Sequence, residues 1–226
     1  MKEMIFDKIL KKYSVIPLLS AASCNSIVYF GSRIVNEGRK HYILKLFLDD
    51  LIPFRTEFVL IYVLAFAHWI IGYLMIARES EEVCYRVISG DLLAKLAAGV
   101  VFILIPTTLN RPWPGGSGFW DQCTRLVFSL DAPDNLFPSI HCLESWMVYR
   151  GSLYMKHPPK YYRPVMLVCA LLVFASTVFL KQHLVIDIAG GVLFAEAGLY
   201  LAKKFRLGRI FEGLNRRLLH IQSGQD

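Results

Sequence analysis

A histidine and an aspartate stand four residues apart in the stretch ASTVFLKQHLVIDIAGG, at His183 and Asp187. On a helix this spacing places both side chains on one face, about one turn apart. The carboxylate can then accept a hydrogen bond from one imidazole nitrogen, which leaves the other nitrogen free for nucleophilic attack. Two alternatives stay open. One is a purely structural pair, and the other is a metal site, which would need a third ligand.

A second histidine, His141, lies in the stretch DAPDNLFPSIHCLES. Pro138 and Ser139 have the form of a helix start, with Ser139 as the N-cap residue. Backbone N–H groups at a helix start bind anions. His141 falls in the first turn of this helix, where it could protonate a leaving oxygen as a general acid. A solvated loop histidine is the alternative.

An arginine, Arg111, lies in the proline- and glycine-rich stretch TTLNRPWPGG. Its guanidinium group could hold phosphate oxygens through two parallel hydrogen bonds. A loop arginine near lipid headgroups is the alternative. Together, the three stretches contain a candidate nucleophile, a candidate proton donor and a candidate anion-binding group.

The elements that must position these residues are long apolar segments. Of the 226 residues, 55% are hydrophobic and only 19% are charged, and the mean hydropathy is +0.43. Continuous apolar runs of roughly 20 residues are typical of membrane-spanning helices. We therefore predict an all-α, polytopic membrane protein, a six-helix bundle forming one domain over residues 1–226. The predicted spans are Tyr13–Val35, Thr56–Ala77, Leu92–Leu109, Ile140–Met155, Pro164–Leu180 and Leu184–Ala202.

The distribution of basic residues predicts the orientation of the bundle. With both termini cytoplasmic, the inside segments carry about twice as many Lys and Arg residues as the outside segments, in keeping with the positive-inside rule. This orientation places Arg111, His141 and His183 at the extracytoplasmic end of their spans. The compact loops and the absence of organelle signals favour a bacterial plasma membrane.

Composition also argues against other classes of function. The net charge of +7 fits cytoplasmic loops facing anionic lipid better than nucleic-acid binding. The five cysteines show neither a disulfide framework nor metal-binding spacing. A transporter or haem-binding protein and a non-catalytic lipid-binding scaffold remain as alternatives. The sequence does not indicate an oligomeric state.

In their order, the three stretches resemble the motifs of the type 2 phosphatidic acid phosphatase superfamily. Arg111–Pro112 is similar to the end of the first motif, and Pro138–Ser139–Ile140–His141 to the second. Ser176, His183 and Asp187 have the spacing of the third. Two basic residues of the family pattern are missing, since Leu104 and Thr177 stand in their places. FPSIH with QHLVIDIAGG also resembles the inositol phosphorylceramide synthase branch, whose members transfer a phosphorylated headgroup between lipids.

The resemblance implies a metal- and cofactor-independent enzyme acting on a lipid phosphate. It implies that His183 attacks phosphorus and forms a phosphohistidine, that Asp187 orients His183, and that His141 protonates the leaving group. The implied phosphate-binding residues are Arg111, Ser139, Lys181 and Ser176, with Lys181 replacing one missing charge. Water as acceptor would make the protein a phosphatase, and a lipid or headgroup hydroxyl would make it a transferase. The lipid substrate is left open.

Overall fold

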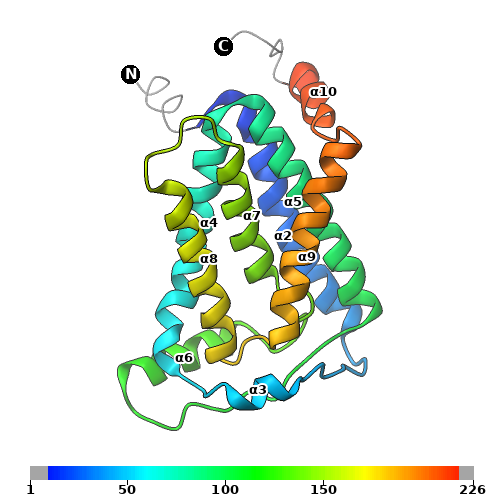
Figure 1. Ribbon diagram of the computed structural model, residues 1–226. Coiled ribbons are helices and arrows are strands. Elements are labelled where there is room, and N and C mark those ends of the chain that lie inside the picture. Colours follow the sequence, from blue (N-terminus) through cyan, green and yellow to red (C-terminus); the bar gives the residue numbers. More distant parts are fainter. Residues whose placement is uncertain (1–9, 219–226) are drawn as a thin grey trace.

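The computed structural model describes residues 10–218, and the regular elements in that part of the chain are all helices. Six long helices form a bundle and run roughly along a common direction (Figure 1). They are α2 (Val15–Asn36), α4 (Val59–Glu79), α5 (Glu81–Leu104), α7 (Ile140–Tyr154), α8 (Tyr162–Phe179) and α9 (Val185–Lys204). The short elements are η1 (Lys12–Ser14), α3 (Phe47–Leu51), η2 (Thr56–Phe58), α6 (Phe119–Leu130) and α10 (Arg209–Leu218). The all-α prediction is therefore confirmed.

Five of these helices are long and apolar enough to cross a membrane: α2, α4, α5, α8 and α9. The spans of α2 and α4 include the short turns η1 and η2 that precede them. Their outward-facing side chains include Ile27, Ile70 and Val100, which are all more than half exposed. Apolar side chains on the outside of a helical bundle are suited to lipid, whose hydrocarbon interior gives polar groups no partners. The chain is an integral membrane protein with several candidate spans.

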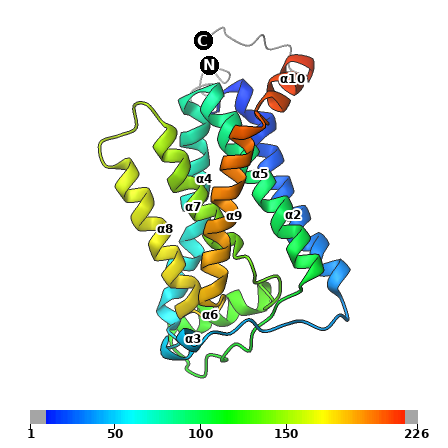
Figure 2. The ribbon, with the colours of Figure 1, turned by 45° about the vertical axis from the view of Figure 1, so that its right-hand side comes forward.

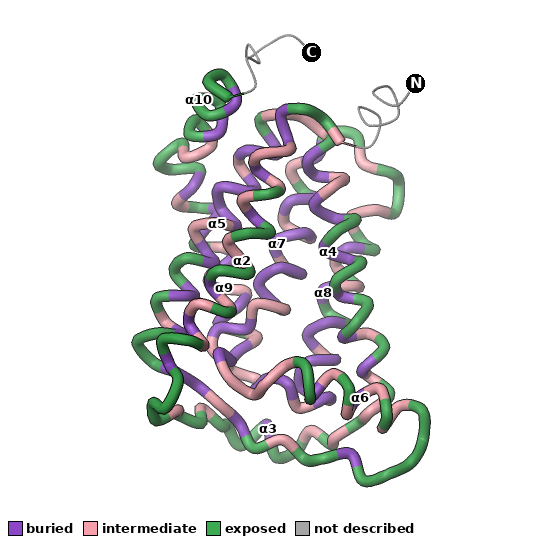
Figure 3. The backbone as a smooth tube through the Cα atoms, turned by 180° about the vertical axis from the view of Figure 1, so that it is seen from behind, coloured by how far each residue is buried: buried purple, intermediate pink, exposed green. Residues whose placement is uncertain are grey.

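Helix α7 differs from the other five because it lies inside the bundle. It contacts α4, α5, α8 and α9 and is largely buried along its length (Figure 3). It has only 15 residues, fewer than the roughly 20 that span a hydrocarbon core. Its central position explains why hydropathy marks it weakly, since its neighbours shield it from lipid.

The predicted boundaries agree with the structure to within a few residues, except for the third span. The prediction began this span at Leu92, but α5 begins at Glu81. The Ser80 hydroxyl caps the helix by accepting a hydrogen bond from the Val83 N–H at 3.2 Å. The charged residues of the first turns thus belong to the helix, and Ser80 alone separates α4 from α5.

The two described ends of the chain lie at the same end of the bundle, opposite to α3 and α6 (Figures 1 and 2). The Asn215 side-chain amide of α10 donates a hydrogen bond to the Tyr13 carbonyl at 2.7 Å, which joins the two ends. The predicted cytoplasmic tail, including Lys2 and Lys8, lies outside the described residues. The three candidate motifs follow the end of α5 and surround the starts of α7 and α9. They therefore lie at the end of the bundle away from α10 (Figure 1).

A buried ion cluster joins α5 to α7 in the middle of the bundle. The Lys95 ammonium group lies 2.7 Å from the Asp91 carboxylate and 2.6 Å from the Glu144 carboxylate. The Tyr73 hydroxyl of α4 donates a hydrogen bond to Asp91 at 2.8 Å. All three charged side chains are almost inaccessible to solvent. Charges with so little access to water are stable only when paired, so this cluster fixes how α5 faces α7.

We expect the substitution Lys95→Met to lower the free energy of unfolding by about 3–5 kcal/mol, because it leaves two buried carboxylates without a counter-ion. Thermal unfolding of the detergent-purified protein measures the effect. Lys204→Met, at an exposed position of α9, is the control and should leave the melting temperature nearly unchanged. The triple variant Lys95→Met/Asp91→Asn/Glu144→Gln should recover much of the loss, and equal melting temperatures for Lys95→Met and the control would contradict the prediction.

Candidate active site

The first turn of α9 holds the candidate nucleophile and its partner. The backbone N–H of Leu184 donates to Asp187 Oδ2 at 2.8 Å, so the aspartate caps its own helix. The same Oδ2 lies 3.3 Å from Nδ1 of His183. A carboxylate only accepts hydrogen bonds, so Nδ1 carries the proton and Nε2 is left with its lone pair. The spacing in the sequence therefore produces the expected histidine–carboxylate pair, and both side chains are buried.

The start of α7 lies directly beside this turn. Ser139 caps α7, with its hydroxyl accepting a hydrogen bond from the Cys142 N–H at 3.3 Å. The Ser139 N–H donates to the backbone carbonyl of Asp187 at 3.1 Å. This backbone contact places the rings of His141 and His183 with their centroids 5.7 Å apart. Two residues 42 positions apart in the chain are thus brought to one site.

Two glycines of α9 make this close approach possible. A Cβ atom at Gly191 would lie 2.6 Å from the Ser139 carbonyl oxygen, and one at Gly190 would lie 2.6 Å from the Phe137 ring. At 2.6 Å the atoms would overlap sterically. Neither position therefore has room for a side chain unless α7 and α9 separate. The Gly–Gly pair of the third motif is therefore a requirement of packing at the site.

Both histidines line a cavity of about 430 Å³. Exposed apolar side chains of α2 and α4, among them Phe30 and Phe66, line its outer part. At the inner part, the His141 ring stacks on Tyr62 with centroids 4.4 Å apart. The Nε2 atom of His141 is buried and has no hydrogen-bond partner among the described residues. An imidazole nitrogen without a protein partner beside a cavity is available to exchange a proton with a bound molecule.

Arg111 lies behind one wall of this cavity. Its Nη1 atom donates to Gln182 Oε1 at 2.5 Å and to the Asp131 backbone carbonyl at 2.8 Å. The guanidinium carbon lies 4.2 Å from the centre of the Phe128 ring. Burial lowers the pKa of Arg111 from its ordinary value. Gln182, which lines the cavity next to His183, thus stands between the arginine and the space where a substrate would lie.

The side chains of Lys181 and Ser176 have partners away from the cavity. The Lys181 ammonium group donates to the carbonyls of Asp49 and Ile52, at 2.9 and 2.6 Å. Burial also lowers the pKa of Lys181. Ser176 is fully buried, and its hydroxyl donates to the Val173 carbonyl at 2.7 Å. Neither residue lines the cavity, and the lysine instead fixes α3 to the turn before His183.

One carboxylate of the cavity, Asp131, was not among the site residues predicted from the sequence. Asp131 follows α6, and its two oxygens accept hydrogen bonds from the hydroxyls of Tyr29 and Tyr62, at 2.5 and 2.7 Å. Burial raises the pKa of Asp131, but His141 and the two tyrosine hydroxyls outweigh it, so the pKa lies below its ordinary value. The two tyrosines resemble ordinary span-end aromatic residues in the sequence, and only the fold brings them to Asp131.

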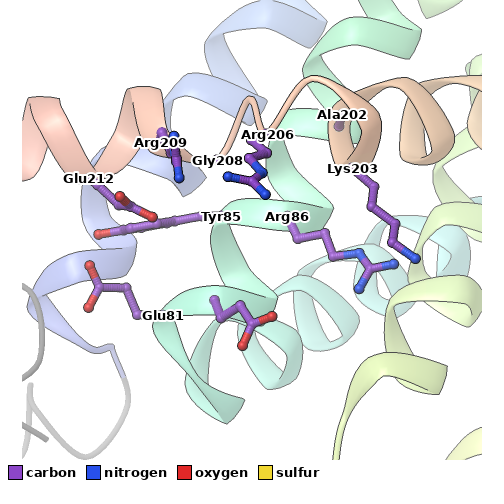
Figure 4. A pocket seen from close by; sticks show the side chains of 10 residues that line it. Glu81, Tyr85, Arg86, Ala202, Lys203, Arg206, Gly208, Arg209 and Glu212 are labelled. Carbon is purple, nitrogen blue, oxygen red and sulfur yellow. The ribbon is translucent and has the colours of Figure 1, made fainter.

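A second hollow, of about 490 Å³, lies at the opposite end of the bundle, between the start of α5, the end of α9 and α10 (Figure 4). It is lined by Arg86, Lys203, Arg206 and Arg209 and by three glutamates. The hollow contains no histidine, and Figure 4 shows its charged side chains spread along the groove. Among the described residues, no group of three or more His, Cys, Asp or Glu side chains could hold a metal. The histidine cavity is therefore the candidate active site.

Fold and site together define an integral membrane protein with a paired histidine–aspartate site at one end of a helical bundle. The sequence model of the PAP2 superfamily matches residues 90–210, more than half of the chain. The chain belongs to this superfamily, the one that its three motifs resemble. The match covers all three motifs and does not distinguish a branch of the superfamily. No curated protein and no solved structure matches the chain.

We expect the substitution Gly191→Ala to lower the free energy of unfolding by about 1–3 kcal/mol, because the added methyl group forces the starts of α7 and α9 apart. The matched control is Gly31→Ala in α2, where no heavy atom lies within 4 Å of the new Cβ. Alanine favours helix over glycine, so the control should be neutral or more stable. Thermal unfolding in detergent compares the two, and a melting temperature for Gly191→Ala at or above the wild-type value would show that the contact does not limit packing.

Proposed function

We propose that the protein is a lipid phosphatase that breaks a phosphate ester or anhydride bond through a phosphohistidine on His183. The observation that carries this proposal is the pairing of His183 with Asp187 beside His141 in one cavity, with the two imidazole rings 5.7 Å apart. Members of the superfamily to which the chain belongs are typically phosphatases.

The geometry supports the following sequence of steps. The phosphate occupies the cavity while its apolar tail lies along the exposed side chains of α2 and α4 in the bilayer. Nε2 of His183 attacks phosphorus, and Asp187 stabilises the resulting imidazolium. His141 gives a proton to the leaving oxygen and then takes one from the incoming acceptor. The N–H groups at the start of α7, capped by Ser139, and the Arg111–Gln182 pair stabilise the phosphate charge.

A second candidate function is transfer of a phosphorylated headgroup to another hydroxyl. It is favoured by the surroundings of Leu104 and Thr177, which stand where the family pattern has basic residues. Leu104 is 68% exposed on the outside of the bundle, and the Thr177 hydroxyl donates to the Phe174 carbonyl. Neither position therefore places a cation at the site. The second negative charge of a phosphate monoester is left without a partner there, whereas a phosphate diester carries only one negative charge.

We also propose that α7 is a sixth span, that the termini are cytoplasmic and that the site faces the extracytoplasmic side. Support comes from the distribution of basic residues and from the position of both described ends opposite to the histidine cavity.

The substitution His183→Ala should lower turnover at least about 10³-fold, because no nucleophile remains to accept the phosphoryl group. The measurement is release of phosphate or of a dephosphorylated lipid from phosphatidic acid and from a polyprenyl diphosphate, followed by mass spectrometry. Rapid quenching of the wild type should find phosphate on His183.

The matched control is His68→Gln, which changes a histidine of α4 that does not line the cavity. Its turnover should stay within a few-fold of the wild type. Full activity in His183→Ala would exclude the phosphohistidine mechanism. A new phospholipid that forms only when a hydroxyl acceptor is present would assign the protein to the transferase function.

The orientation can be tested with two single cysteine substitutions at exposed positions, Ser117→Cys at the site end and Lys160→Cys at the opposite end. In intact cells, a membrane-impermeant thiol reagent should label Ser117→Cys, and it should label Lys160→Cys only after the membrane is opened. Cells expressing the unsubstituted protein provide the background for the five native cysteines. The reverse labelling pattern would place the site on the cytoplasmic side.

A further inference from the structure

The cavity around the two histidines has an unusual charge for a phosphate site. Its lining contains two aspartates, Asp131 and Asp134, and no lysine or arginine. The remaining lining is mainly apolar and aromatic, with polar contributions from residues such as Asn25 and Gln182. Charges that face a cavity with apolar walls act strongly on a bound ion, because little water screens them.

The two aspartates differ in their partners. The Asp134 carboxylate lies 3.0 Å from Nε of Arg33, which neutralises it. Asp131 takes part in none of the ion pairs of the described residues, and its carboxylate accepts only the hydroxyls of Tyr29 and Tyr62. Arg111 bonds to the backbone carbonyl of Asp131, not to its carboxylate. Asp131 is therefore the aspartate of the cavity that forms no direct ion pair with a described residue, although Arg111 and the two histidines act on its carboxylate from a distance.

This charge bears directly on the kind of phosphate that can bind. A lipid phosphate monoester would bring up to two negative charges beside Asp131, with no lysine or arginine in the lining to offset them. A phosphodiester with an ammonium group on its headgroup has no net charge. Its ammonium group would meet the Asp131 carboxylate, which keeps unused lone pairs after accepting two hydroxyls. The aromatic rings of the lining also attract a cation at their faces.

We propose that the site takes phosphodiester lipids whose headgroup carries an ammonium group, and that Asp131 is the specificity-determining residue that pairs with this group. The inference rests on the proposed function and names its substrate class. The headgroup lies in the cavity against Asp131, while the lipid tails extend past α2 and α4 into the bilayer.

The placement of the headgroup determines which bond breaks. Nε2 of His183 forms a bond to phosphorus as the bond between phosphorus and the glycerol oxygen breaks. His141 gives its proton to that oxygen, and diacylglycerol leaves. The headgroup phosphate stays on His183 until water, or another hydroxyl, loses its proton to His141 and attacks phosphorus, which frees His183. Water gives a soluble headgroup phosphate, and a lipid hydroxyl gives a new phospholipid.

The test compares four lipids with identical acyl chains in mixed micelles with the purified protein. Phosphatidylethanolamine and phosphatidylcholine carry an ammonium group, phosphatidylglycerol is an uncharged-headgroup diester, and phosphatidic acid is a monoester. Diacylglycerol, the product common to all four, is measured by mass spectrometry. We expect kcat/KM for the better ammonium lipid to exceed that for phosphatidylglycerol about tenfold or more. A preference for phosphatidic acid or phosphatidylglycerol would overturn the inference.

The variant Asp131→Asn separates recognition from a structural role. It should lower kcat/KM for the ammonium lipids about tenfold or more while that for phosphatidylglycerol changes little, since only a charge pair is lost. A role limited to holding Tyr29 and Tyr62 would lower the values for all four lipids equally and would overturn the inference. Asp134→Asn is the matched control, because Arg33 already neutralises Asp134, and it should leave the headgroup preference unchanged.

Failure of this inference differs from failure of the proposed function. Loss of the headgroup preference with His183-dependent turnover intact overturns only the role of Asp131. Absence of turnover for every lipid, or turnover that survives in His183→Ala, overturns the proposed function. In that case, binding of the same four lipids still ranks the headgroups; it is followed by the tryptophan fluorescence, to which Trp69 in the cavity lining contributes. Equal binding by wild type and Asp131→Asn would then reject the role of Asp131.

Discussion

The contact between the first turns of α7 and α9 sets the geometry on which the site depends. A backbone hydrogen bond from Ser139 to Asp187 and the absence of side chains at Gly190 and Gly191 allow the two helix starts to touch. Each helix then carries its histidine in or just before its first turn. Because the Asp187 side chain also caps α9, the group that orients His183 is itself fixed by the helix that it begins.

Charged side chains inside the bundle serve two different purposes. Lys95, Asp91 and Glu144 neutralise one another and join α5 to α7, far from solvent. Asp131, at the site, is held by two tyrosine hydroxyls and forms no ion pair within the described part of the chain. Pairing stabilises the first group far from solvent, whereas the carboxylate of Asp131 depends on two hydroxyl donors beside the cavity near the end of the bundle.

Much of the fold could be predicted from the sequence, because apolar runs and basic residues report directly on helices in a membrane. The order of the helices and the end at which the three motifs lie follow from them. The start of α5 was predicted wrongly, because the predicted span began after Asp91, whereas Asp91 lies inside the helix and is paired with Lys95. The histidine–aspartate pair was visible because its spacing is local. Asp131 was missed because its tyrosine partners lie 102 and 69 residues away.

The position of Lys181 shows why side-chain direction at a turn is harder to infer than helix position. Lys181 lies two residues before His183, and the prediction was that its charge replaces a missing phosphate ligand. Its backbone adopts a left-handed conformation with φ of 54°, and its ammonium group bonds to carbonyls beside α3. The cavity thus keeps the histidine pair of the superfamily but not the expected cations. In the proposed mechanism, phosphoryl transfer depends on the histidines and the charge around them selects the substrate, so the two functions rest on different residues of the cavity.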